Sequence, residues 1–437
     1  MLLITNANIL TPDKIIHNAA LCIDGNTIAE IGPIPDLEKK YPSAKRINAK
    51  GGLVMPGLTN CHMHFYSTFA RGMLLAGTPP TTFTEILEGL WWRLDKVLTA
   101  DDVFYSALVP LIECVRSGTT CVIDHHASPN FVLGSLNKIK EALSQIPVRA
   151  SLCYEVSDRD GKDIAAQGID ENTQFIKDHA GNNMLKGLFG LHASFTLSDK
   201  TLEQCAQAVN NLKTGIHVHT AEGVADADHC RQNHGCGVVE RWRQFNLLGP
   251  RAILAHCIHI DHKEMQIIKE TGTNVVHNPE SNMNNAVGSA DILKMLALGI
   301  NVGLGTDGIT SDMFQEAKFA HLKRKHVAHD PRVGFAETTK LLFENNYKIL
   351  ANLFKGTLGT ITKGAFADLI ILDYQPPTPF NRQNFAGHFL YAMNSNLVAT
   401  TIVDGKVLMH DREIIGIDVE RVMAVSRGLA QKMWGRI

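Results

Sequence analysis

Eight short apolar segments, separated by stretches of helix length, constrain the fold of this chain more than any other feature. They comprise residues 53–60, 120–124, 148–154, 186–191, 215–218, 252–255, 273–276 and 300–305. Buried strands that alternate with helices are typical of a (β/α)8 or TIM-like barrel, in which the chemistry lies at the C-terminal ends of the strands. We therefore expect an α/β protein whose functional residues follow these segments.

Both ends of the chain are expected to form strands outside this pattern. The strand-like segments there are residues 2–9, 20–23, 27–31, 367–373 and 400–409. Asp-Gly turns at Asp24 and Asp404 suit hairpins, and residues 419–434 have the apolar spacing of a helix. We predict a small β-sandwich domain built from both chain ends. The predicted boundaries are 1–54 for its first part, 55–357 for the barrel, and 358–437 for its second part with the C-terminal helix.

Composition narrows the partners and the compartment. The formal net charge of -2 provides no basic field for nucleic acid, and no apolar run reaches membrane-spanning length. The first ten residues lack the basic lead-in of a signal peptide, and nine cysteines without a CxxC pair suit reduced thiols. We expect a cytoplasmic protein that binds a small-molecule substrate, with neither nucleic acid nor membrane as a partner.

Histidines and carboxylates gather where the apolar segments end. One segment leads into His62-Met63-His64, and side chains two apart on a strand point to the same face, so the two imidazoles can share a cation. The later clusters are His217, His219 and Glu222, then His256, then Asp307. Each cluster alone is a modest signal, because surface or core histidines arise by chance. Their repeated position at strand ends favours a metal site.

In this order on the expected strands, the motifs resemble the amidohydrolase superfamily, and within it the mononuclear branch of cytosine, guanine and S-adenosylhomocysteine deaminases. The resemblance spans nearly the whole chain. Within that branch the chain is most similar to aminohydrolases associated with selenium metabolism. The motifs that carry this likeness are Trp91-Trp92-Arg93-Leu94-Asp95, Asp124-His125-His126-Ala127-Ser128-Pro129 and Ser281-Asn282-Met283-Asn284-Asn285.

The resemblance implies one divalent metal held by four side chains. These ligands are His62, His64, His219 and Asp307. Three nitrogens and one oxygen leave a position for water and suit Zn2+ or Fe2+, with Zn2+ preferred. Binuclear relatives use a carboxylated lysine after the fourth strand, and residues 191–196 contain no lysine. The sequence therefore favours a single metal.

The implied reaction is hydrolytic deamination at an amidine-like carbon of a purine, pyrimidine, pterin or nucleoside. Asp307 takes a proton from the metal-activated water, and His256 polarises that water or steadies the developing charge. Glu222 protonates the ring nitrogen and helps ammonia to leave. The alternative interpretations are a hydrogen-bonded core histidine for His256 and a surface glutamate for Glu222.

The substrate pocket is predicted from residues near strand ends and covering loops. The candidates are Tyr66, Trp92, His126, His192 and Asn282. Tryptophans often belong to a core, and either His125 or His126 could bond the backbone instead. Guanine deaminases carry glutamine three residues after the HxH pair, and this chain has Ser67 there, which disfavours a guanine-type substrate.

Two other functions compete with deamination. The same site suits hydrolysis of another bond, as in a formimino deiminase or a triazine chlorohydrolase. Measuring whether ammonia or chloride is released distinguishes deamination from dechlorination. A non-catalytic scaffold is the other alternative, although it predicts missing ligands and this chain has all four. The resemblance also allows a homodimer.

Overall fold

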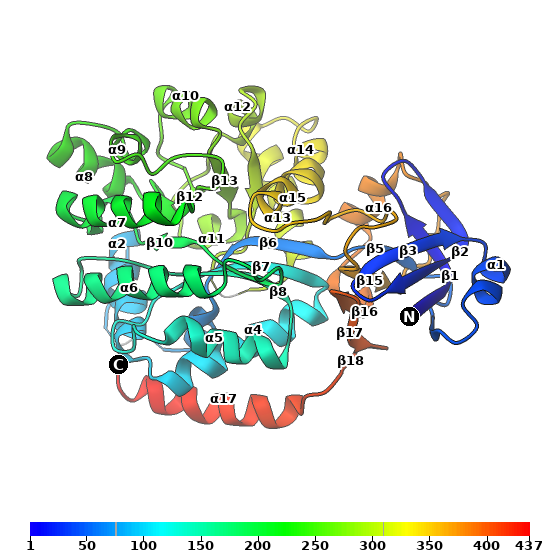
Figure 1. Cartoon of the computed structure of the whole chain (residues 1–437). Helices are drawn as coiled ribbons and strands as arrows, with labels where there is room; N and C mark the ends of the chain where they lie inside the picture. Colours follow the sequence, from blue (N-terminus) through cyan, green and yellow to red (C-terminus); the bar gives the residue numbers. More distant parts are fainter. Residues whose placement is uncertain (75–76, 309) are drawn as a thin grey trace.

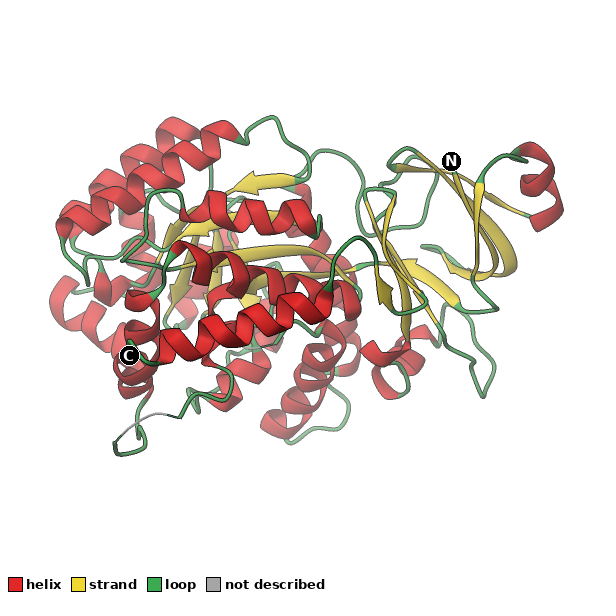
Figure 2. Ribbon diagram, turned by 90° about the horizontal axis from the view of Figure 1, so that it is seen from below, coloured by secondary structure: helices red, strands yellow, loops and turns green. Residues whose placement is uncertain are grey.

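The structure is a computed structural model that describes residues 1–74, 77–308 and 310–437. Helices surround parallel strands in the larger part of the molecule, and a separate sheet lies at the other end (Figures 1 and 2). That sheet combines the blue N-terminal strands with the orange and red C-terminal strands. Both expected regions are therefore present.

The parallel strands form two sheets in chain order. The first contains β6 (Leu58–Met63), β7 (Thr119–His126), β8 (Arg149–Tyr154) and β9 (Leu185–Gly187). The second contains β10 (Phe189–Leu191), β11 (Ile216–Thr220), β12 (Ile253–His256), β13 (Asn274–His277) and β14 (Val302–Leu304). Every residue of β7 and β8 is buried, which explains their continuous apolar sequence. All eight expected segments contain a strand.

The two parallel sheets touch along the edge where the last strand meets the first. Met63 and Asp307 form a bridge, and the Asp307 amide donates to His62 O at 2.9 Å. Asn346, buried at the start of α15 (Asn346–Ala351), donates to Thr59 O at 2.8 Å and accepts from the Leu304 amide at 2.7 Å. One side chain thus joins β6 to β14.

A second buried asparagine joins the opposite pair of edges. Asn172, on α6 (Lys162–Asp178), exchanges hydrogen bonds of 2.7 and 2.8 Å with the backbone of Tyr154 and donates to Gly190 O at 3.4 Å. A bridge between Val156 and Leu191 lies beside it. The two sheets therefore contact each other at both edges.

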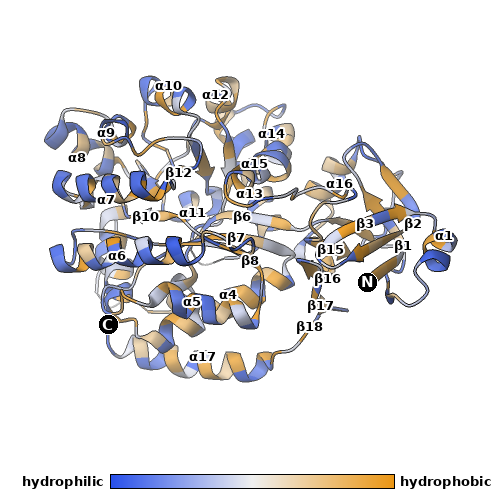
Figure 3. Cartoon of the chain, in the orientation of Figure 1, coloured by the Kyte–Doolittle hydropathy of each residue, from blue (hydrophilic) through white to orange (hydrophobic). Residues whose placement is uncertain are grey.

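Most helices of the chain cover these sheets, several of them with amphipathic faces, whereas the first, residues 34–40, packs against the N-terminal strands. Their bounds are α1 (Ile34–Lys40), α2 (Phe83–Ile86), α3 (Trp92–Leu94), α4 (Ala100–Arg116), α5 (Ser135–Gln145), α7 (Asp199–Leu212), α8 (Val224–His234), α9 (Val238–Gln244), α10 (His262–Thr271), α11 (Pro279–Asn284), α12 (Ile292–Ala297), α13 (Met313–Ala328), α14 (Phe335–Lys340), α16 (Phe385–Tyr391) and α17 (Val419–Trp434), besides α6 and α15. Short 3-10 or π turns occupy 65–70, 87–91, 95–97, 194–196, 341–345 and 395–397. Hydrophilic and hydrophobic residues alternate along helices such as α6 and α17 (Figure 3).

Local signals set the helix ends. For α10, the Asp261 side chain accepts from the Glu264 amide at 2.9 Å, and the Glu264 side chain accepts from the Asp261 amide, which forms a capping box. The helix ends at Gly272, whose φ of 67° is the left-handed conformation that glycine adopts without strain. No helix in the described part of the chain is both long and apolar enough to cross a membrane.

A nine-stranded sheet combines the two ends of the chain. Its order is β18-β17-β16-β15-β5-β1-β2-β3, with β4 paired to β1. The strands are β1 (Leu2–Leu10), β2 (Ile15–Asp24), β3 (Thr27–Gly32), β4 (Lys45–Asn48), β5 (Leu53–Pro56), β15 (Leu369–Leu372), β16 (Val398–Val403), β17 (Lys406–His410) and β18 (Glu413–Ile414). The expected segment 53–60 is therefore divided at Gly57. Its first half, β5, pairs with β15 in this sheet, and only its second half joins the parallel strands.

Two contacts tie the end sheet and the C-terminal helix to the larger part. Arg149 on β8 is fully buried. Its guanidinium contacts two carboxylates at the end sheet: Asp368, just before β15, at 2.8 Å, and Asp404, just after β16, at 3.3 Å. Helix α17 leaves the end sheet and packs against α4 (Figure 1). The predicted C-terminal helix thus covers the parallel-strand region and not the end sheet.

Candidate active site

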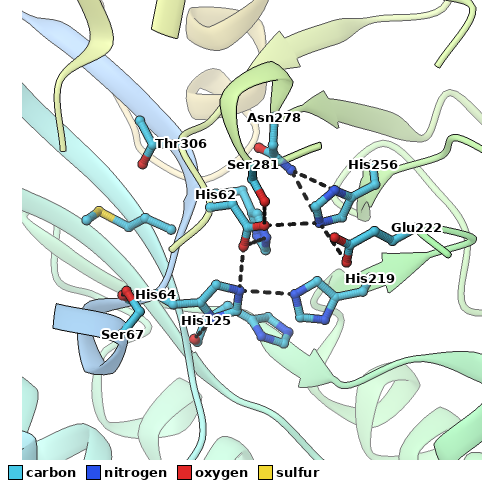
Figure 4. A network of polar contacts seen from close by, with 12 residues as sticks. His62, His64, Ser67, His125, His219, Glu222, His256, Asn278, Ser281 and Thr306 are labelled. Carbon is cyan, nitrogen blue, oxygen red and sulfur yellow. Dashed lines mark hydrogen bonds and ion pairs between the residues drawn. The ribbon is translucent and has the colours of Figure 1, made fainter. Parts of the chain in front are cut away.

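Side chains from several strand ends meet at one point, as the sequence predicts (Figure 4). His62 Nε2 lies 3.3 Å and His64 Nε2 3.0 Å from Asp307 Oδ1. His219, from β11, places its Nε2 3.1 Å from His64 Nε2. Three imidazole nitrogens and one carboxylate oxygen therefore converge, although they are far apart in the sequence.

Each of these imidazoles is oriented by a contact of its other nitrogen. His64 Nδ1 donates to His125 O at 2.6 Å, and His219 Nδ1 donates to His192 O at 2.9 Å. His62 Nδ1 lies 2.8 Å from Nε2 of His217. These partners turn the Nε2 atoms toward Asp307, the arrangement that metal-binding histidines normally have.

The donor set fits a divalent metal. His62 Nε2 is buried and forms no hydrogen bond with the described residues. Burial lowers the pKa of His62 to about 3 and lowers the pKa of His219 well below its usual value, so both rings are neutral. A neutral imidazole offers the lone pair that a metal requires. A partly different set of mutually close atoms, from His62, His219, His256 and Asp307, is also compatible with a metal ion.

A carboxyl group and a fourth imidazole lie beside this centre. His256 Nε2 is 3.4 Å from Glu222 Oε2 and 3.7 Å from Asp307 Oδ2, while its Nδ1 contacts Asn282 Oδ1 at 2.8 Å. Burial, and then the charge of Asp307, raise the pKa of Glu222 well above its usual range. Glu222 is therefore suited to hold a proton at neutral pH.

The backbone at this centre is locally strained. Ala221, His256 and Asp307 have positive φ angles of 48°, 72° and 60°, a conformation that residues with a side chain rarely adopt. Gly305 approaches β6 so closely that a Cβ atom there would lie 2.6 Å from the His62 amide nitrogen. Tight packing of β14 on β6 thus determines where Asp307 points.

A pocket opens over the centre. It is lined by His64, Tyr66, Ser67, Phe83, Thr84, Leu87, Trp91, Trp92, Glu155, His192, Ala193, Phe195, His219, Glu222, Gly223, Ala225, Asp226, Glu280, Ser281, Asn284, Asn285, Asp307, Gly308 and Thr310. The predicted substrate-binding residues Tyr66, Trp92 and His192 belong to this lining. The pocket therefore joins aromatic walls to the converging imidazoles.

Two predicted pocket residues lie one layer behind the lining. Asn282 is fully buried and holds His256, as described above. His126 is also buried, contacts Ser128 Oγ at 2.9 Å, and packs edge-on against Tyr66 with 6.0 Å between ring centroids. Burial lowers the pKa of His126 to about 3. Both residues support lining side chains in this geometry.

Comparison with protein-family models assigns the chain to a family. The model of the amidohydrolase family matches residues 53–408. The chain belongs to the amidohydrolase family. This amidohydrolase accordingly has a fold of TIM-barrel type.

Two curated relatives match this amidohydrolase over nearly their whole length. A 5'-deoxyadenosine deaminase of Methanosarcina mazei is 31% identical, with 100% of this chain and 99% of the relative covered. A 5-methylthioadenosine/S-adenosylhomocysteine deaminase of Acetivibrio thermocellus is 30% identical, with 99% of each covered. An adenosine deaminase from Xanthomonas campestris, solved with bound zinc, superposes with a TM-score of 0.86 at 22% identity over 99% of this chain and 98% of its own.

Three further site residues of this amidohydrolase were not predicted from the sequence. Glu155 directly follows β8 and faces the pocket, so its position at a strand end was an available signal. His217 belongs to the same sequence cluster as His219, and its Nε2 contacts His62 Nδ1 at 2.8 Å. Ser281 donates to Asp307 Oδ2 at 2.5 Å, a contact between distant segments that no local pattern announces.

Proposed function

We propose that this amidohydrolase hydrolyses the bond between an amidine-like ring carbon and its amino group, and releases ammonia. The observation that carries the proposal is the position of Glu222 in the pocket lining, with the buried His256 beside it and three imidazoles and Asp307 next to both. The prediction of a metal-dependent aminohydrolase of heterocycles is confirmed by the family and by curated deaminase relatives. Adenine nucleosides are the first substrate class to test.

The proposed metal ligands are His62, His64, His219 and Asp307. Their convergence and the orientation of their Nε2 atoms support this set, as does the zinc in the Xanthomonas campestris structure. We assign Zn2+ to the site. His256 stays outside the ligand set because Asn282 holds its Nδ1 and its Nε2 faces both carboxylates.

The reaction needs a nucleophile, a proton for the ring nitrogen and a proton for the leaving amino group. A bound divalent ion supplies an activated water at neutral pH. Asp307 accepts the proton of that water, and His256, 3.7 Å from Asp307 Oδ2, stabilises the negative charge that develops on the attacked carbon's substituents. Glu222 donates its proton to the ring nitrogen, and the proton held by Asp307 passes to the amino group, which leaves as ammonia. The hydroxyl on the attacked carbon then returns a proton to Glu222 as the carbonyl forms. The products are the ring carbonyl compound and one ammonia for each water consumed.

Finer features of the architecture are part of the same proposal. We propose that the two parallel sheets close into one (β/α)8 barrel, supported by the bridges at both edges. The end sheet is proposed as the β-sandwich domain, with boundaries near 54 and 358. A cytoplasmic location is supported by nine free thiols. A homodimer and the absence of nucleic-acid binding remain predictions.

The test is ammonia release by purified, zinc-loaded protein. Adenosine and 5'-deoxyadenosine should release one equivalent each, with inosine-type products seen by absorbance. Metal analysis should give one zinc per chain, and chelation should abolish turnover until zinc is restored. Zinc-loaded protein that releases no ammonia from purine, pyrimidine or pterin amines would contradict the proposal, and chloride release from a chlorotriazine would support the dechlorination alternative.

A further inference from the structure

The described lining of the pocket carries acidic side chains but no lysine or arginine. Among its described lining residues there is no lysine or arginine, while five carboxyl groups line it: Glu155, Glu222, Asp226, Glu280 and Asp307. Arg159 lies behind the wall, 5.2 Å from the Trp92 ring, and is paired with Asp95 at 2.6 Å. The described lining therefore offers no lysine or arginine to bind a carboxylate or a phosphate.

Three of these carboxyl groups have other partners. Asp307 contacts the imidazoles, Asp226 accepts from the amides of Phe195 and Ala221 at 2.9 Å, and Glu280 accepts from Gln315 at 2.8 Å. Glu222 faces His256 in the deamination site. Glu155 remains as a carboxylate that the proposed reaction does not use.

Glu155 is buried yet faces the pocket. Glu155 is 5% exposed, and one of its carboxylate oxygens lies 3.2 Å from His125 Nδ1. The other oxygen lies 3.7 Å from His192 Nε2, beyond hydrogen-bond range, and accepts no hydrogen bond from the described residues. A carboxylate oxygen of Glu155 lies within 4.8 Å of imidazole nitrogens of His64 and His219. A heterocycle over the metal ligands would therefore lie next to this acceptor.

We propose that Glu155 binds N–H or O–H donors on the edge of the substrate, and that this pocket selects neutral or cationic heterocycles and rejects those carrying a carboxylate or phosphate. The inference rests on the proposed deamination, whose substrate class it narrows. An anionic group would enter a lining that holds five carboxyl groups and, among its described residues, no lysine or arginine, whereas a donor edge satisfies Glu155.

Matched pairs of substrates test the selection on the unaltered, zinc-loaded protein. Each pair shares a ring and differs by one anionic group: adenosine and its 5'-monophosphate, cytidine and its 5'-monophosphate, pterin and pterin-6-carboxylate. We expect kcat/KM for ammonia release to be at least about tenfold higher for the uncharged member of any reactive pair. Equal or better turnover of the anionic member would overturn the inference while supporting deamination. If no pair reacts, the proposed function fails. The affinities of the two members of each pair, measured by calorimetry, then test whether the pocket prefers the uncharged member.

Glu155→Gln tests the residue itself. It keeps the shape but removes the charge, so KM for the uncharged substrate should rise about tenfold, kcat should change less, and the preference against the anionic member should shrink. Zinc content and the melting temperature report whether the site and fold persist. The matched control is Glu141→Gln, on the exposed face of α5, which should behave as wild type. Wild-type KM and preference in a folded, zinc-bound Glu155→Gln protein would overturn the assignment, and the substrate pairs decide the selection even if this variant fails to fold.

Discussion

Two carboxyl groups that face the same pocket differ in their surroundings. Glu222 is buried near Asp307, and both effects favour its protonated form. For Glu155 burial alone would raise the pKa, but His192 and His125 outweigh it and hold the pKa well below the usual range. One group is thereby suited to donate a proton and the other to accept hydrogen bonds, which follows the general rule that environment sets the role of a carboxyl group.

Replacing the proposed proton donor should separate turnover from metal binding. In Glu222→Gln the amide cannot transfer a proton, so kcat should fall by about 10²–10⁴ while the zinc content stays at wild-type level. Steady-state ammonia release and metal analysis measure the two effects. Glu203→Gln, the same change on the exposed face of α7, is the control. Undiminished turnover in Glu222→Gln would remove Glu222 from the mechanism.

Metal affinity should increase with pH. Burial lowers the pKa of His64, but the hydrogen bond and charge of Asp307 override it and raise the pKa to about 9, so the metal-free ring carries a proton at neutral pH. The incoming ion must displace that proton, and the apparent association constant should fall about tenfold for each pH unit below about 9. Zinc titration calorimetry in buffers of different ionisation enthalpy counts the protons released. A pH-independent affinity would argue against His64 as a ligand.

At the scale of elements, two asparagine side chains form hydrogen bonds at the places where the parallel sheets meet with little strand pairing. Asn172 and Asn346 reach from helices to the places where the two parallel sheets meet, and each satisfies backbone groups on both sides. Strand pairing there is limited to single bridges. These side chains therefore supply hydrogen bonds that a continuous sheet would make between its own strands.

Removing one of these side chains should destabilise the fold strongly. Asn346→Ala leaves the amide of Leu304 and the carbonyl of Thr59 without these partners in a buried place, and should lower the free energy of unfolding by about 2–4 kcal/mol. Urea unfolding followed by circular dichroism measures the loss. Asn352→Ala, which removes an exposed asparagine next to the same helix, should cost far less. Equal effects of the two substitutions would refute the role of Asn346.

Local pattern predicted the elements well but not where they join. The residues at strand ends, from His62 to Asp307, were predicted because a buried strand and the polar residue after it are both visible in a short window. The sequence did not predict that the segments 53–60 and 186–191 each divide between two sheets, at Gly57 and Leu188. A continuous apolar run contains no local signal for a change of sheet. Glu155 could have been found by the strand-end rule, whereas Ser281 on Asp307 depends on tertiary contacts.

At the scale of the whole molecule, one buried arginine connects the end sheet to the parallel strands. The Arg149 guanidinium contacts both Asp368 and Asp404 and lies over the Phe366 ring, 4.8 Å from its centroid. Its partners come from the C-terminal part of the chain, so no sequence pattern near β8 foretells them. The pairing fixes how the two parts sit against each other.

Breaking this pairing should weaken the whole molecule. Arg149→Ala leaves the Asp368 carboxylate buried without its partner, and should cost about 3–5 kcal/mol of unfolding free energy. Chemical unfolding monitored by tryptophan fluorescence measures the change. Arg243→Ala removes an exposed ion pair with Glu270 and should have an effect near zero. A loss below about 1 kcal/mol in Arg149→Ala would show that the pairing contributes little.

The pairing of β5 with β15 also sets an order of events during synthesis. β5 leaves the ribosome early, and β1 covers one of its edges, but the other edge waits for Leu369–Leu372, which is made after all the parallel strands. Until then an apolar strand presents open backbone groups, a state prone to pairing with other chains. The region that carries the chemistry can thus assemble first, and the nascent chain is most exposed to aggregation at the end sheet, outside the parallel strands that carry the active site.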